Sequence, residues 1–117
     1  MELVALLGQD KESWGQVLGL INHGSWDKVI LVKTIKDSFI SPHPNTEEVF
    51  VDSSSSISDM RGYLLDKLKS KLTEFEACLS IASGNGKEHM ALISALLSIP
   101  LGIRLVVYTK KGIEFIN

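Results

Sequence analysis

Short apolar runs without polar alternation recur along the 117-residue chain. Such runs are typical of strands that are covered on both faces of a parallel sheet. The segment Lys110-Lys111-Gly112 is typical of a hairpin turn, so we expect the last two strands to be antiparallel. The runs predict strands at 3–7, 28–32, 77–83 and 103–108, a weaker strand at 48–51 and a short last strand at 113–116.

Apolar residues at helical spacing separate most of these runs. Residues 33–47 contain two prolines and no clear period, so the connection between the second and third strands should be irregular chain. Strands alternating with helices favour right-handed βαβ units. We therefore expect one domain over residues 1–117, an α/β, Rossmann-like three-layer sandwich. Its mostly parallel sheet should have the order 3-2-1-4-5, with a C-terminal antiparallel edge strand. The predicted helices run from residue 10 or 11 to 22, from 57 to 72 and from 87 to 98.

Composition narrows the class of protein further. The chain is 44% hydrophobic and 22% charged, which is typical of a globular protein rather than a disordered one. Its formal net charge of −2 excludes general electrostatic binding to DNA. The single cysteine, Cys78, cannot form an internal disulfide, which suits the cytoplasm. No signal peptide is visible and no apolar stretch is long enough for a membrane span, so we expect a cytoplasmic protein.

The most informative segment is the loop Ser83-Gly84-Asn85-Gly86-Lys87, which lies between an apolar strand and an apolar helix. This arrangement directs backbone N–H groups and a helix N-terminus towards an anion, and Lys87 adds a cation. A Walker A loop does not fit, because Glu88 stands where that motif has serine or threonine. The dinucleotide-binding motif does not fit either, because His89 holds the position of its third glycine. A βα turn that is merely rich in glycine remains the alternative.

A second polar loop follows the first predicted strand and contains Gly8, Gln9 and Asp10. In the predicted strand order, strands one and four are neighbours, and the helices that follow them lie on opposite faces. Open α/β sheets bind ligands at such a point, beyond the carboxyl ends of the strands. The two loops together therefore predict a ligand site.

Individual residues have both functional and structural interpretations. Lys87 is the strongest candidate for binding phosphate, with a solvated surface lysine as the alternative. Ser83 and Asn85 can bind a ligand or cap the helix, and Asp10 favours an N-cap over ligand binding. Gln9 can donate to a phosphate or a base edge, and His89 can contact an adenine or serve as a partly buried structural residue. No spacing of histidines or cysteines predicts a metal, no cofactor motif is present, and no catalytic dyad is readable.

The order of elements and the two loops resemble a CRISPR-associated Rossmann-fold (CARF) domain. The segment Gly84-Asn85-Gly86-Lys87, followed by His89, is similar to the second ligand loop of that family, although Asn85-Gly86 replaces a threonine often found before the lysine. The resemblance implies binding of cyclic oligoadenylate in a groove shared by a homodimer. Most members carry a C-terminal effector, and none follows Asn117 here. We therefore expect a stand-alone sensor, a ring-cleaving enzyme or a subunit that acts through a separate effector protein.

Three functional hypotheses remain open from the sequence. The first is a sensor of cyclic oligoadenylate, the second is a metal-free ring nuclease acting on the same ligand, and the third is an interaction protein without a small ligand. The helix at 87–98 is apolar nearly all round, with only Ser94 and Ser98 interrupting. Its outer side should therefore be buried by a second copy, unless the C-terminal hairpin or the first helix covers it.

Overall fold

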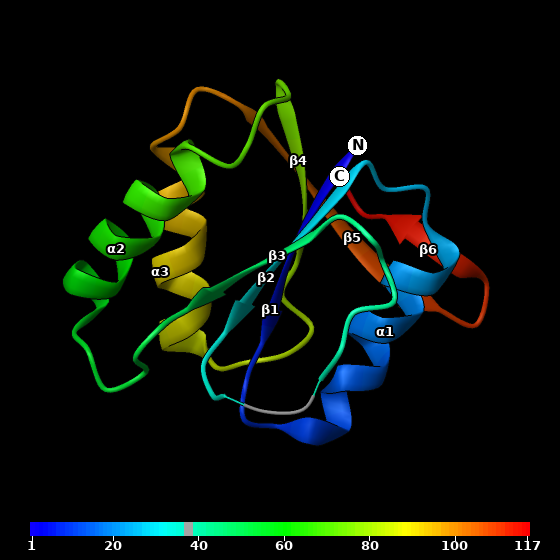
Figure 1. The fold of residues 1–117 in the computed structure, drawn as a ribbon, viewed down its shortest axis with the longest axis horizontal. Helices are drawn as coiled ribbons and strands as arrows, with labels where there is room; N and C mark the ends of the chain where they lie inside the picture. The colour runs from blue at the N-terminus through cyan, green and yellow to red at the C-terminus, as the bar shows by residue number, and fades with distance from the viewer. Residues whose placement is uncertain (37–38) are drawn as a thin grey trace.

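The computed structural model describes residues 1–36 and 39–117, and these form a sheet with helices on both faces (Figure 1). The strand order is β3-β2-β1-β4-β5-β6. All neighbouring pairs are parallel except β5 and β6, which are antiparallel. The predicted α/β class, strand order and antiparallel C-terminal edge strand are therefore confirmed. The elements are β1 (Glu2–Leu7), η1 (Lys11–Ser13), α1 (Trp14–His23), β2 (Lys28–Lys33), β3 (Thr46–Phe50), α2 (Ile57–Lys69), β4 (Glu76–Ser80), α3 (Gly86–Leu97), β5 (Gly102–Thr109) and β6 (Gly112–Phe115).

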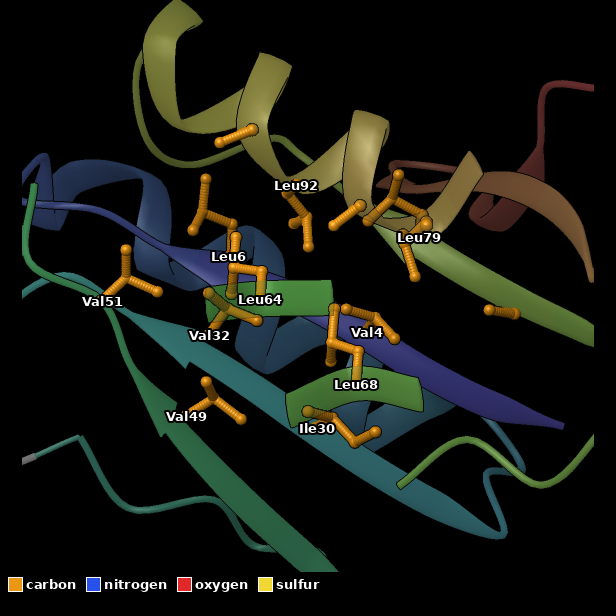
Figure 2. Packing of buried hydrophobic residues seen from close by; sticks show 14 of the residues in the cluster. Val4, Leu6, Ile30, Val32, Val49, Val51, Leu64, Leu68, Leu79 and Leu92 are labelled. Atoms are coloured by element: carbon orange, nitrogen blue, oxygen red, sulfur yellow. The ribbon is translucent and has the colours of Figure 1, made fainter. Parts of the chain in front are cut away.

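The continuous apolar run of β1 is explained by burial on both sides of the sheet. Leu3, Ala5 and Leu7 pack in the cluster that includes α1, whereas Val4 and Leu6 pack in the cluster beneath α2 and α3. Figure 1 shows α2 and α3 together on one side of the sheet and α1 on the other. Figure 2 shows the α2–α3 side, where side chains from β1, β2, β3 and β4 meet those of the two helices. The helices after β1 and β4 thus lie on opposite faces, as predicted.

Several predicted boundaries need correction. The fourth strand was expected to reach Ser83, but β4 ends at Ser80. Ile81 and Ala82 continue the apolar sequence while the chain already turns away from the sheet, and Ala82 is exposed. The first helix begins with a 3₁₀ turn before α1, and α2 ends at Lys69 rather than at residue 72. The latter end is closed by backbone N–H groups of residues 71 and 72, which both donate to the Leu68 carbonyl.

The connection between β2 and β3 contains no helix in its described residues, as the sequence predicted; positions 37 and 38 of this segment lie outside the described residues. Side chains attach it to the rest of the fold. The His43 Nε2 lies 2.7 Å from the Trp26 carbonyl oxygen, and the Phe39 ring packs edge-on against Trp14 at 5.9 Å between centroids. None of the helices in the described part of the chain is both long and apolar enough to cross a bilayer.

Candidate functional site

The two glycine-containing loops predicted to form a site lie against each other beyond the ends of β1 and β4. The backbone N–H of Gly8 donates to the Ser83 hydroxyl at 2.9 Å, and that hydroxyl donates to the Asp10 carboxylate at 3.2 Å. The same carboxylate oxygen accepts from the N–H of Gly84 at 2.9 Å. Ser83 is fully buried, so it serves as the connection between the loops rather than as a surface for ligand.

Asp10 stands at the N-cap position of η1, as the sequence favoured, but its side chain binds the other loop. Its side chain makes no capping hydrogen bond to the following helix, although its backbone carbonyl accepts from the Ser13 hydroxyl at 2.7 Å. Desolvation acts to raise the pKa of Asp10, but hydrogen bonds, first among them that from the Gly84 N–H, outweigh it and lower the pKa below its ordinary value. Asp10 is therefore an ionised connection across 74 residues of sequence.

Both glycines at the contact are needed for the close approach of the loops. A Cβ atom on Gly8 would lie 2.4 Å from the Gly84 Cα. Gly84 has a φ of +95°, and a Cβ there would lie 2.4 Å from the Leu6 Cδ2. Such distances are far below van der Waals contact, and the positive φ itself disfavours side chains. These two residues therefore shape the site by allowing the loops to pack.

The N-terminus of α3 is closed by a reciprocal pair of hydrogen bonds. The Asn85 side chain accepts from the Glu88 N–H at 3.0 Å, and the Glu88 carboxylate accepts from the Asn85 N–H at 3.0 Å. This is a capping box. The N–H groups of Gly86 and Lys87 lie in the first turn, where a helix offers no acceptor, and no acceptor for them is found among residues 1–36 and 39–117. They remain available to an anion.

Lys87 and His89 are both held by backbone carbonyls. The Lys87 ammonium donates to the Ser53 carbonyl at 2.9 Å, which attaches the loop after β3 to the start of α3. The His89 Nε2 lies 2.8 Å from the Ser83 carbonyl oxygen. Since a carbonyl oxygen only accepts, this nitrogen carries a proton. His89 thus supports the loop in the structural role that the sequence allowed.

A cleft of about 370 Å³ lies between the two loops. It brings together Gln9, Asp10, Gly84 and Asn85 from the predicted set, while Gly8 and Ser83 are buried in the contact between the loops. Gly86 and His89 instead line a groove on the outer side of α3. The full lining of the cleft is Gln9, Asp10, Ser53, Gly84, Asn85 and Glu88.

Sequence reasoning underestimated two residues of this cleft. The sequence analysis did not place Ser53 in the site, yet it forms part of the wall because β3 ends at the same edge of the sheet as β1 and β4. Glu88 was used only to exclude a Walker A loop, whereas it is 3% exposed and caps α3. The spacing of Asn85 and Glu88 was the available signal, because a cap residue followed three positions later by Glu marks a capping box.

The charges in the cleft define what it can bind. Asp10 and Glu88 contribute carboxylates to the lining, and no lining residue is a cation. An anionic ligand would have to be met by the N–H groups of Gly86 and Lys87, which follow the lining residue Asn85 in the chain, and by the Lys87 ammonium that is bound to the Ser53 carbonyl. Carboxylate oxygens accept from hydroxyl or amino groups, as a sugar would supply. Within the described residues, no three His, Cys, Asp or Glu side chains are grouped so that they could hold a metal ion.

The fold and the cleft define the class of this chain as an α/β domain with a polar cleft where the strand order reverses. Comparison with protein-family models, with curated proteins and with solved structures gives no match.

Proposed function

We propose that this chain is a nucleotide second-messenger binding domain that senses cyclic oligoadenylate, in a groove shared by two copies, as part of CRISPR antiviral defence. The observation that carries the proposal is the cleft between the hydrogen-bonded loops Gly8–Asp10 and Ser83–Lys87, beside two N–H groups at the start of α3. A cytoplasmic location and an output through a separate effector protein are parts of the same proposal.

The chemistry of the cleft suits a phosphate joined to a sugar. A phosphate oxygen placed at the N-terminus of α3 would accept from Gly86 and Lys87 N–H and gain from the helix dipole. Sugar hydroxyls would donate to the carboxylates of Asp10 or Glu88, which both line the cleft. A phosphodiester carries one negative charge, so it tolerates these neighbouring carboxylates better than a triphosphate does.

The outer side of α3 supports the two-fold assembly in this proposal. Met90 is 60% exposed and Leu97 is 71% exposed, and with Ile93 they line an apolar groove of about 420 Å³. The first helix does not cover this groove, because α1 lies on the opposite face of the sheet (Figure 1). Gly86 and His89 also line the groove. A second copy seated there would therefore come beside the start of α3.

Titration calorimetry with cyclic tetra-adenylate and cyclic hexa-adenylate, followed by chromatography of the ligand, tests the proposal. We expect saturable binding and intact ligand. Binding accompanied by linear products would instead show the metal-free ring nuclease. Absence of binding to either ring would overturn the proposal and leave an interaction protein without a small ligand.

A further inference from the structure

A second and larger cavity opens at the same edge of the sheet, between the end of β3 and the first turns of α2. Its volume is about 570 Å³, against about 370 Å³ for the polar cleft. Val51 and Met60 form a buried apolar floor, and the rings of Phe50 and Tyr63 are 38% and 43% exposed at its walls. Concave apolar sites with a few polar groups are the usual form of small-molecule pockets. The aromatic walls favour a flat ring as the occupant.

The polar groups at this cavity are mainly acceptors. Asp52 and Asp59 contribute two carboxylates, against one ammonium from Lys36 that lies 5.8 Å from the centre of the Phe50 ring. One Asp52 oxygen already accepts from the N–H and the hydroxyl of Ser54, at 2.9 and 2.6 Å. Asp59 is exposed in the first turn of α2, and its carboxylate meets no hydrogen-bond or ion-pair partner among residues 1–36 and 39–117. This side chain can accept from an amino group on a ligand.

The two cavities are separated by a single loop, residues 52–56. Ser53 lines the polar cleft, whereas its neighbour Asp52 and nearby Ser55 line the apolar cavity. Because Asp52 and Ser53 are adjacent in the chain, with Cα atoms about 3.8 Å apart, the linings of the two cavities meet at this loop. The hydrogen bond from Lys87 to the Ser53 carbonyl fixes the loop at the start of α3.

We infer that the apolar cavity receives the base of the nucleotide, a flat purine ring bearing an amino group, while the phosphate lies at the N-terminus of α3. This inference rests on the proposed function and adds the place and the chemistry of base recognition. The base packs against Phe50 and Tyr63, and its amino group donates to the Asp59 carboxylate. In a shared groove, each copy would hold the base of one adenylate unit in this way.

Methionine methyl groups provide a direct readout of the cavity. Met60 lies in its floor, Met90 lies on the outer side of α3 and Met1 lies at the N-terminus. We expect adenosine 5′-monophosphate to shift the NMR signals of the Met60 methyl and of the Gly84 and Gly86 amides together. Inorganic phosphate should shift the two amides alone.

A comparison of two ligands isolates the role of Asp59. Purine riboside 5′-monophosphate matches adenosine 5′-monophosphate except that it has no amino group. The substitution Asp59→Ala should lower the affinity for adenosine 5′-monophosphate about tenfold, because that ligand loses a hydrogen bond. The affinity for purine riboside 5′-monophosphate should change by less than about twofold. Asp66→Ala, on an exposed residue further along α2, is the matched control and should leave both affinities unchanged.

The outcomes separate the inference from the proposed function. Suppose that cyclic tetra-adenylate shifts the loop amide signals, the Met60 methyl signal does not move, and Asp59→Ala does not change the affinity for adenosine 5′-monophosphate. The inference is then overturned and the proposed function stands. If adenosine 5′-monophosphate shifts Met60 with the Asp59 dependence but no nucleotide shifts the loop amides, the cavity remains a purine site and the proposed function fails. If no probe shifts either set of signals, both are overturned.

Discussion

Single residues in this site act mainly through contacts to the other loop. Asp10 accepts from Gly84, Ser83 connects to Gly8, and Lys87 attaches to the carbonyl of Ser53. The predicted strand order brought the two glycine-containing loops together, but it did not include Ser53. Their partners could not be read from the sequence, because each contact crosses more than 30 residues of chain and depends on which strands become neighbours.

Lys87→Ala should weaken binding of cyclic tetra-adenylate while leaving the fold intact. The change removes a cation beside the anion site and frees the Ser53 loop. Loss of one charge-assisted contact costs on the order of 1.5–3 kcal/mol, or about ten- to hundredfold in affinity. Calorimetry measures the effect, and Lys110→Ala in the exposed hairpin serves as the control. An unchanged dissociation constant would remove Lys87 from the site.

The hydrogen bonds of Asp10 predict a dependence of stability on pH. Because its folded pKa lies below its unfolded value of about 3.9, the ionised carboxylate stabilises the fold above that pH. This contribution is lost as the pH falls through the folded pKa. Asp10→Asn, which does not ionise, should be less stable than the wild type at pH 7, and the difference should shrink towards pH 2. Urea unfolding across this range measures it; a constant difference would contradict the assignment.

At the scale of elements, continuous apolar runs predicted β1, β2 and β4, because parallel strands that are buried on both faces of the sheet require apolar side chains on both. The signal was weaker for β3, where only Val49 is buried and the strand begins at Thr46 rather than at residue 48. The same signal misplaced the end of β4, since Ile81 and Ala82 are apolar but already belong to the turn. The turn between β4 and α3 depends on Gly84, whose φ of +95° directs the chain towards the start of α3. The two glycine loops were predicted as neighbours, whereas the wall contributed by Ser53 required knowledge of how the loop after β3 folds back.

Gly84→Ala should destabilise the β4–α3 turn. The new methyl group would meet the Leu6 side chain at 2.4 Å on a backbone that disfavours any side chain, so we expect a loss of about 1–3 kcal/mol in the free energy of unfolding. Gly62→Ala in α2 is the matched control, since its Cβ meets nothing within 4 Å. There, alanine should stabilise the helix by about 0.5–1 kcal/mol. Equal effects of the two substitutions in urea unfolding would contradict this account of the turn.

For the whole molecule, the feature that bears on assembly is α3, which is apolar on both its inner and its outer side. The cluster beneath α2 and α3 buries Ala91, Leu92, Ala95 and Leu96 on the inner side of α3. The outer side of α3 still carries Met90 and Leu97, which a monomer leaves in contact with water, beside the half-buried Ile93. In the proposed dimer, burial of this stripe would join assembly to ligand binding, because the groove includes Gly86, in the turn that would receive the phosphate.

If two copies meet through this stripe, a charge placed in it should separate them. We expect the wild-type chain to scatter light as a dimer of twice its 12.9 kDa mass at micromolar concentration. Leu97→Glu should give a folded monomer, because Leu97 is 71% exposed within one copy and its replacement buries no charge there. Phe75→Ser removes a comparable apolar side chain that is 93% exposed outside the stripe, and it should remain dimeric.

The Leu97→Glu monomer should also bind cyclic tetra-adenylate more weakly than the wild type, because it retains only one of the two α3 N-termini that would surround a symmetric ring. Adenosine 5′-monophosphate, which needs only one copy, should bind both proteins equally. A wild-type chain that stays monomeric with and without cyclic ligand would remove both the dimer and the shared groove. A Leu97→Glu monomer with undiminished affinity for the ring would instead place the whole ligand site within a single copy.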